Sequence, residues 1–418
     1  SLLDDLMTFV YSGHKCQLML IGDTAQLPPV KLSLSPALDA GKLSLGFGKD
    51  VVEMELDEVV RQSRESGILM NATRLREQLQ LDPPPQFRFS LSGFADIIGL
   101  VDGYESQDAS NDAFDTNGQE ETAVIVRSNK RANLYNKNIR SRLLFLENQL
   151  ATGDYMMVVK NNYFWLKSSS DAGFIANGDI LEILEIFAFK SLYGFSFAEV
   201  KVRMVDYPGQ PPFETVLLLD TLEAETPSLS YEDSNRLYQE VMKDYQQERS
   251  GYKKFLAVKN NPFFNALQVK FSYAITCHKA QGGQWETVFV EQPYLSGKAD
   301  REYLRWLYTA VTRARNRLYL IGFHSDFFVE KCTGHSTRCQ AHNSAADQGT
   351  CPPTQPNVAH LDSTGCEKQV VLAPGHKGLA NELAALCPDR YVLQVGIVGA
   401  QSPCGGNGLT VGRMDSTG

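Results

Sequence analysis

Cysteine is scarce in all but the last part of this 418-residue chain. Only Cys16 and Cys277 precede Lys331, and they lie far apart in the sequence. Isolated cysteines do not form the disulfide framework of small secreted domains, so we expect a reduced, cytoplasmic compartment. No apolar run approaches the roughly 20 residues of a membrane span, and no signal-peptide pattern opens the chain. A membrane partner is therefore not expected.

The chain also lacks an excess of positive charge. It has 40 Lys and Arg against 49 Asp and Glu, a formal net charge of −9. Phosphate binding needs clustered Lys and Arg, so this balance argues against a broad nucleic-acid patch. This balance does not exclude a narrow nucleic-acid channel with locally basic walls. The length predicts two or three domains with a packed core.

A Gly-x4-Gly-Lys-Ser/Thr phosphate loop is missing from the sequence. Such a loop cradles phosphates with backbone N–H groups and places a hydroxyl on Mg²⁺. The stretch Gly46-Phe-Gly-Lys-Asp50 imitates its end, but Asp50 replaces the hydroxyl and no glycine stands at position 43. The chain as given therefore offers no phosphate cradle of this type.

The stretch that organises the rest runs from Val269 to Gly322. Alternating apolar residues from Val269 to Ile275 predict a strand, and a polar, glycine-rich loop follows from Thr276 to Gly283. After a short apolar run, a helix is predicted from four apolar residues at i, i+3, i+4 and i+7, which would lie on one face: Leu304, Leu307, Tyr308 and Val311. Thr309, Thr312 and Arg313 are expected elsewhere on its surface, and Arg317–Gly322 is expected as a buried strand. This order predicts an open α/β sheet.

Two stretches in this region resemble helicase motifs. Tyr273-Ala-Ile-Thr-Cys-His-Lys-Ala-Gln-Gly282 resembles motif V of superfamily 1 helicases, and Leu307-Tyr-Thr-Ala-Val-Thr-Arg-Ala-Arg315 resembles motif VI. The pattern is most similar to the RecD-like branch, superfamily 1B, which translocates 5′ to 3′. That resemblance implies a RecA-like parallel-sheet motor domain.

Two earlier stretches extend the resemblance. Gly22-Asp-Thr-Ala-Gln-Leu-Pro-Pro-Val30 follows a short apolar strand and resembles motif III, and Val59-Val-Arg-Gln62 resembles motif IV. By resemblance, Gln26 senses the γ-phosphate, and Arg313 with Arg61 stabilises the transition state across the cleft. The residues that the resemblance implies at the nucleotide are Gly22, Asp23, Gln26, Arg61, Gln281, Gly282 and Arg313.

The same resemblance implies a nucleic-acid side. Its residues are Pro28, Pro29, Thr276, His278 and Lys279. Structural alternatives stay open for these groups and for the arginines: an ordinary proline turn, a structural histidine, a surface ion pair at Arg61 and a structural ion pair at Arg313. Trp285 and Phe289 are candidates for base stacking, with Phe289 favoured as core.

Between motifs IV and V the residue pattern changes to one typical of short strands. Asn177-Gly178 is a hairpin signal, and alternating runs follow at Ile180–Phe187 and Ala198–Met204. A small barrel is predicted, which resembles the SH3-like insertion of RecD-like helicases. The basic stretch 128–142 is expected to face either phosphate or solvent. The predicted division has five segments: the remnant of a first RecA-like domain at 1–50, the second RecA-like domain at 51–150 and 263–328, the inserted barrel with its helical return at 151–262, and a Cys- and Gly-rich tail at 329–418.

The tail matches no helicase element. Cys332-x2-His335-x3-Cys339-x2-His342 has ligand types that zinc accepts, and a disordered or non-native extension is the alternative. Otherwise no metal ligands are assigned, because the resemblance places the Mg²⁺ ligands upstream of this chain.

The resemblance implies the C-terminal portion of an ATP-dependent DNA helicase acting on single-stranded DNA and duplex junctions, with ATP and Mg²⁺ as cofactors. Its other partner is the missing N-terminal half of the motor, so the chain alone is expected to be inactive. A nuclease or repair partner is not identified. The alternatives are a non-enzymatic remnant that binds nucleic acid or a partner, and an RNA-directed helicase of superfamily 1.

Overall fold

The computed structural model describes residues 2–14, 16–54, 66–100, 102–167, 169–170, 172–295, 297, 299–329 and the backbone of 396–399. Arg61 and the possible zinc ligands of the tail lie outside these residues. Among the described residues, no helix is long and apolar enough to cross a membrane.

The N-terminal part contains two helices and two short strands. They are α1 (Leu2–Ser12), β1 (Leu18–Leu20), the 3-10 turn η1 (Pro36–Leu38), α2 (Ala40–Phe47) and β2 (Asp50–Val52). The strand β13 (Gly396–Gly399) pairs antiparallel with both strands, so the sheet order is β1-β13-β2. Gly48, at φ 59°, ends α2 and donates to Ser44 O. The stretch 46–50 thus closes a helix, whereas a phosphate loop opens one.

A five-stranded parallel sheet forms the centre of the molecule. Its strands are β3 (Ile97–Leu100), β4 (Thr122–Val126), β10 (Ala274–Thr276), β11 (Trp285–Glu291) and β12 (Ala314–Ile321). Their order is β10-β4-β11-β12-β3, and every neighbouring pair is parallel. This arrangement confirms the α/β class and the parallel sheet predicted from the sequence.

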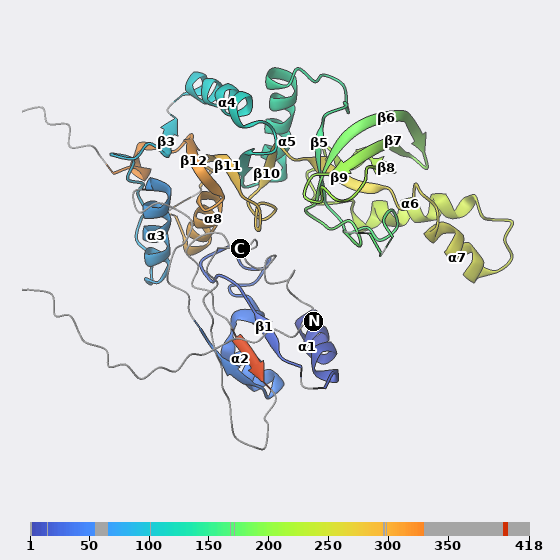
Figure 1. The fold of residues 1–418 in the computed structure, drawn as a ribbon, viewed down its shortest axis with the longest axis horizontal. Coiled ribbons are helices and arrows are strands. Elements are labelled where there is room, and N and C mark those ends of the chain that lie inside the picture. The colour runs from blue at the N-terminus through green and yellow to red at the C-terminus, as the bar shows by residue number, and fades with distance from the viewer. Residues whose placement is uncertain are drawn as a thin grey trace, which may run out of the picture.

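Helices cover both faces of this sheet (Figure 1). α3 (Gly67–Leu79) and α8 (Arg301–Val311) pack on one face, and α4 (Gly103–Asn117) and α5 (Asn129–Asn138) on the other. The alternation of β4 explains this, because Ile125 joins the core under α3 and α8 while Val124 and Val126 join the opposite core. Both faces are buried, as expected for a parallel sheet.

Helix α8 confirms the predicted apolar face, because Leu304, Leu307, Tyr308 and Val311 are all buried. Thr309, Thr312 and Arg313 lie off that face, as predicted, and they are buried as well, with exposures of 0%, 5% and 1%. Helical spacing describes one packed face and cannot show that a distant loop covers another.

A closed five-stranded barrel stands beside the sheet (Figure 1). It consists of β5 (Tyr155–Val158), β6 (Ile180–Leu192), β7 (Phe195–Met204), β8 (Phe213–Leu218) and β9 (Leu267–Phe271). The tight turn of its long hairpin is Tyr193-Gly194, with φ of 57° and 75°. Asn177-Gly178 forms the turn predicted there, with Asp179 N donating to Ala176 O at 3.2 Å, and it leads into β6, which pairs antiparallel with β5. Helices α6 (Tyr231–Lys243) and α7 (Gly251–Lys259) lie between β8 and β9 in the sequence.

The sequence predicts one strand from Val269 to Ile275, but the structure divides it between two sheets. β9 closes the barrel, and β10 joins the parallel sheet after Ser272 and Tyr273. The barrel therefore extends into the segment 263–328 that the sequence assigns to the motor domain. Alternation did not reveal the division, because both strands have the same period.

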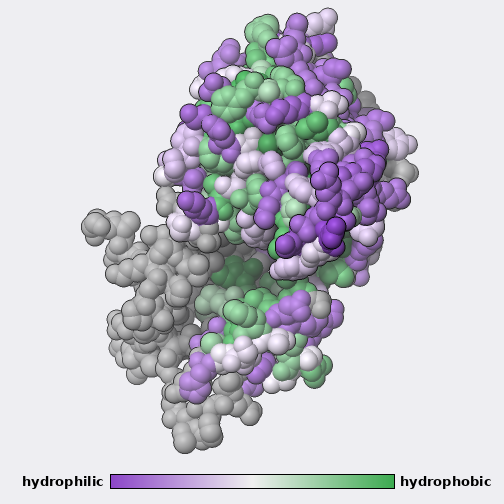
Figure 2. Space-filling view, turned by 90° about the vertical axis from the view of Figure 1, so that its right-hand side faces the viewer, coloured by the Kyte–Doolittle hydropathy of each residue, from purple (hydrophilic) through white to green (hydrophobic). Residues whose placement is uncertain are grey.

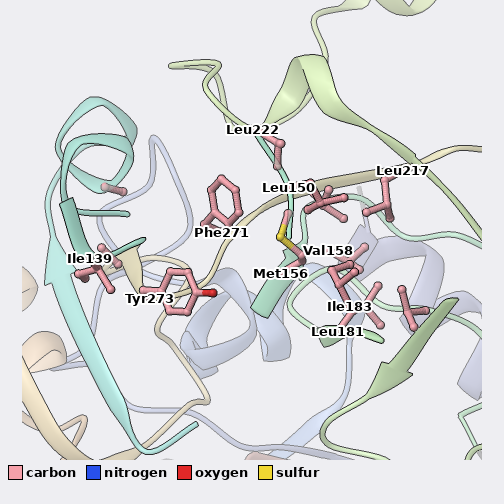
Figure 3. Packing of buried hydrophobic residues seen from close by; sticks show 14 of the residues in the cluster. Ile139, Leu150, Met156, Val158, Leu181, Ile183, Leu217, Leu222, Phe271 and Tyr273 are labelled. Carbon is pink, nitrogen blue, oxygen red and sulfur yellow. The ribbon is translucent and has the colours of Figure 1, made fainter. Parts of the chain in front are cut away.

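A buried ion pair fixes this junction. The Arg140 guanidinium donates to both Asp154 oxygens, at 2.8 and 2.9 Å, and the Asp154 side chain is fully buried. The Tyr273 hydroxyl donates to the same carboxylate at 2.9 Å. Figure 3 shows Tyr273 and Phe271 between Ile139 and the barrel residues Met156 and Val158. The core of the barrel and one core of the sheet are thus continuous.

The positive residues of α5 lie on a face that is largely open to solvent, and two of them also pair with carboxylates. Lys130 lies 3.8 Å from Glu225, and Arg131 pairs with Glu291. Asn133 donates to Glu223 O at 2.8 Å. This helix therefore anchors the segment that leads from the barrel to α6.

Candidate functional site

The loop that follows β1 carries the first group of predicted site residues. A Cβ at Gly22 would come within 2.7 Å of the end of the Leu38 side chain, so that side chain would have to shift to admit any other residue there. The φ of Gly22 lies outside the left-handed region. A cavity of about 340 Å³ borders the loop, and Gly22, Asp23, Gln26, Pro28, Pro29 and Gln281 are among its lining residues.

Leu27 joins this loop to the two distant stretches. Its backbone N–H donates to Thr309 Oγ1 at 2.9 Å, and its carbonyl accepts from Gln281 Nε2 at 2.9 Å. Both backbone polar groups of this buried residue are thus satisfied by side chains about 280 and 250 residues later in the sequence. The three predicted motif stretches meet at one residue.

Asp23 organises the same loop from within. Its carboxylate accepts from Ala25 N at 3.0 Å, from Gln26 Nε2 at 3.3 Å and from Arg76 Nη1 at 2.9 Å. Burial raises the pKa of this carboxyl, and Arg76 acts in the opposite direction. Asp23 therefore orients Gln26, and Arg76 holds Asp23 from α3.

Sequence reasoning missed Arg76. It lies on α3, and no pattern in the sequence distinguishes it from Arg74 on the same helix. Thr309 was missed for the same reason, because a Thr between apolar helix positions has the pattern of an exposed residue. Only contacts across long sequence separations identify the two.

Arg313 follows the last turn of α8. Its guanidinium donates to Thr309 O at 2.9 Å, Gly283 O at 3.1 Å and Thr312 Oγ1 at 3.0 Å, and the residue is 1% exposed. Arg313 thus contacts the residue that holds Leu27, but it is not among the residues that line the cavity. It lies at the amino end of β12, opposite the strand ends where the sequence predicts ligands.

The loop after β10 contains the predicted nucleic-acid residues. Thr276 is half-buried, His278 is exposed, and Cys277 is buried with its thiol donating to Trp306 O at 3.4 Å. Burial raises the pKa of Cys277. Desolvation lowers the pKa of His278, while Glu302 acts to raise it. His278 is therefore an exposed imidazole whose pKa lies below its ordinary value, and Cys277 is a structural thiol.

Lys279 connects this loop to the barrel. Its amine donates to Asn177 Oδ1, and the Asn177 N–H donates to Asn161 Oδ1 at 2.7 Å. Burial lowers the pKa of Lys279. Gly282, at φ 87°, provides the turn that returns the chain toward β11.

Figure 2 shows a hollow between the larger upper and the smaller lower mass of the molecule, on the side where the barrel lies.

The remaining candidates are structural. Phe289 is fully buried and stacks on Tyr319 at 4.7 Å between ring centroids. Trp285 lies against Gly283, where a Cβ would come within 2.5 Å of its ring. Arg315 pairs with Glu121 and Glu286. Within the described part of the chain, no group of three His, Cys, Asp or Glu side chains could hold a metal ion.

Residues 271–321 match the family model of the UvrD-like helicase C-terminal domain. The match includes both stretches predicted as motifs V and VI. A curated relative, DNA helicase B of Mus musculus, is 33% identical over 118 residues, which cover 23% of this chain and 11% of that protein. The chain thus spans about a tenth of the length of that relative. These similarities support a superfamily 1 helicase, without support for the RecD-like class in particular.

Two solved helicase structures are also similar. The Pif1 helicase from Bacteroides in complex with ADP-AlF3 and ssDNA has a TM-score of 0.35 and 12% identity, covering 74% of this chain and 63% of that one. The Pif1 helicase from Candida albicans has a TM-score of 0.24 and 14% identity, covering 63% and 54%.

Proposed function

We propose that this chain is the C-terminal portion of an ATP-dependent DNA helicase of the RecD-like class. The complete motor would translocate on single-stranded DNA and unwind duplex DNA at junctions. The observation that carries the proposal is the double anchoring of Leu27 by Thr309 and Gln281, which joins the stretches similar to motifs III, V and VI. The match of residues 271–321 to the UvrD-like helicase C-terminal domain independently supports the helicase part of the proposal.

The nucleotide would lie beside the loop of Gly22, Asp23 and Gln26. The cavity there is bordered by polar side chains of Gln26 and Gln281, which fit part of a phosphate-bearing ligand. Arg313 can contact the nucleotide only if its guanidinium gives up its hydrogen bonds to the oxygens of Thr309, Gly283 and Thr312 and binds phosphate instead. ATP with Mg²⁺ would supply the free energy of the motor, and Arg61 remains a proposed second arginine.

On the nucleic-acid side, we assign Thr276, His278 and Lys279 to the DNA backbone, with Pro28 and Pro29 beside them. The exposure of His278 and the position of Lys279 against the barrel loop support this. The closed barrel would correspond to the SH3-like insertion of RecD-like helicases.

Fluorescence anisotropy with labelled oligothymidylate tests the proposal on the chain as it stands. We expect binding that weakens as salt rises, and about tenfold weaker binding for Lys279→Ala. Lys137→Ala is the matched control, because Lys137 is an exposed lysine on α5. Equal binding by the Lys279→Ala variant and the parent chain would contradict the DNA assignment.

ATP hydrolysis is a second measurement. We expect none from this chain alone, because the sequence has no Gly-x4-Gly-Lys-Ser/Thr loop. DNA-stimulated ATPase activity of the isolated chain would overturn the proposal of an incomplete motor. An oligouridylate arm distinguishes the alternatives: preferential RNA binding indicates an RNA-directed helicase, and binding of neither strand favours a partner-binding remnant.

A further inference from the structure

A second cavity, of about 450 Å³, lies beside the barrel and away from the site described above. The segment after β5, helix α6, the end of α7 and the segment before β9 form its walls. We call it the α6 groove, and its lining residues are Lys160, Asn161, Asn162, Tyr163, Phe164, Leu229, Ser234, Leu237, Lys259, Phe264, Asn265, Ala266 and Gln268.

The charge of the α6 groove has one sign. Lys160 and Lys259 are its charged lining residues, and both are exposed. No carboxylate is among the lining residues, although the chain has more acidic than basic residues. An anionic ligand would meet two amines here without repulsion from a neighbouring Asp or Glu.

Three amide side chains of the groove already form hydrogen bonds within the fold. Asn162 donates to Asn265 O at 2.9 Å, and Asn265 donates to Lys259 O at 2.7 Å. Gln268 accepts from Leu229 N at 3.0 Å. These amides are thus committed to the fold and have little capacity to read base edges, which leaves the two amines as the main polar recognition groups.

Apolar side chains separate the amines. Leu237 is 4% exposed and Ala266 is 9% exposed, and Leu229 and Phe264 pack against the same cluster. An apolar side chain of a ligand would find contacts here that a phosphodiester backbone could not use. The combination of an apolar wall with basic groups matches a ligand that is both apolar and acidic.

The surface of α7 extends this pattern beyond the groove. Tyr252, Phe255 and Leu256 are 70%, 42% and 37% exposed, and helical spacing places them on the same face as Lys259. Lys259 lies over the Phe255 ring at 5.0 Å and also lines the groove. Figure 2, which views the side where α6 and α7 lie, shows hydrophobic residues interspersed among hydrophilic ones.

We propose that the α6 groove binds an acidic, amphipathic peptide segment of a partner protein. Its apolar side chains would contact Leu237 and Phe264, and its carboxylates would pair with Lys160 and Lys259. A longer segment would continue over the exposed face of α7. This interaction requires no nucleotide and does not use the loops of Gly22 or Thr276, so it can hold or fail independently of the helicase proposal.

The test uses a short fluorescein-labelled peptide that alternates Glu with Leu and Phe, measured by anisotropy with the whole chain. We expect saturable binding that weakens at least about tenfold in the double variant K160E/K259E. The control K31E/K137E makes the same change in charge at exposed lysines outside the groove, and should bind as the parent does. Thermal unfolding confirms that both variants fold.

Three outcomes would overturn the proposal. The first is that the peptide shows no saturable binding to the parent chain. The second is that the two charge-matched variants lose peptide affinity equally. The third is that the groove binds oligothymidylate and not the peptide. The last would appear as oligothymidylate binding lost in K160E/K259E while the peptide remains unbound. A second variant, Phe264→Ser, weakens peptide binding without a change in charge if the apolar contact contributes.

Discussion

Arg76 Nη1 lies 2.9 Å from Asp23 Oδ1 and 3.3 Å from the Tyr308 hydroxyl. The side chains of Arg76 and Asp23 are 14% and 4% exposed, so this is a largely buried ion pair. It connects the loop that carries Gln26 with α3 and with α8. Through it, the position of Gln26 depends on residues of the parallel-sheet domain.

Breaking this pair from one side should destabilise the fold. For Arg76→Met we expect a loss of about 3–5 kcal/mol in the free energy of unfolding, because Asp23 would remain buried without its partner. Urea unfolding followed by circular dichroism measures this. The double variant Asp23→Asn/Arg76→Met should recover part of the loss, because no uncompensated charge remains. A double variant as unstable as Arg76→Met would contradict the ion-pair explanation.

The bond from Leu27 N to Thr309 gives a second prediction. Thr309→Val keeps the shape of the side chain but removes the hydroxyl, leaving a buried N–H unsatisfied at a cost of about 1–3 kcal/mol. Thr309→Ser retains the acceptor and should cost less. Urea unfolding of both variants measures the difference, and a loss for Thr309→Ser as large as that for Thr309→Val would contradict the prediction.

The buried ion pair at the junction between the barrel and the sheet gives a third prediction. Arg140→Met leaves the fully buried Asp154 carboxylate without its bidentate partner, and we expect a loss of about 3–5 kcal/mol. Tyr273→Phe removes one hydrogen bond to the same carboxylate and should cost about 1.5–3 kcal/mol. Chemical unfolding provides both values. A smaller loss for Arg140→Met than for Tyr273→Phe would contradict this ranking.

Lys270 makes stability depend on pH. Burial, and to a lesser extent Lys279, lowers the pKa of its amine from 10.5 to about 8. The unfolded chain therefore binds this proton more tightly than the folded chain between these two values. The contribution of Lys270 to stability is full above pH 10.5 and is lost as the pH falls through about 8.

The free energy of unfolding should accordingly rise more steeply with pH, from about 8 upward, in the parent chain than in Lys270→Met. Urea titrations at several pH values measure the two slopes. Lys137→Met is the control, because Lys137 is exposed, and its slope should match that of the parent. Identical slopes for parent and Lys270→Met would refute the prediction.

Local patterns in the sequence predicted the parallel sheet and the apolar face of α8 well. A buried face imposes a periodicity, and that periodicity survives in the sequence because each residue contributes by its own position. The same argument failed at Val269–Ile275, where two strands of equal period follow each other.

The sequence by itself determined the α/β class, the presence of small strands between the motif-like stretches, and the presence of polar loops at Gly22 and after Thr276. Only the tertiary structure decided that Leu27 meets Thr309 and Gln281, that Arg76 holds Asp23, and that Arg313 is buried. The physical reason is that these contacts join residues tens to hundreds of positions apart. Their side chains carry no periodic signal, and burial of Thr309 and Arg313 depends on which distant loop the folded chain places over them.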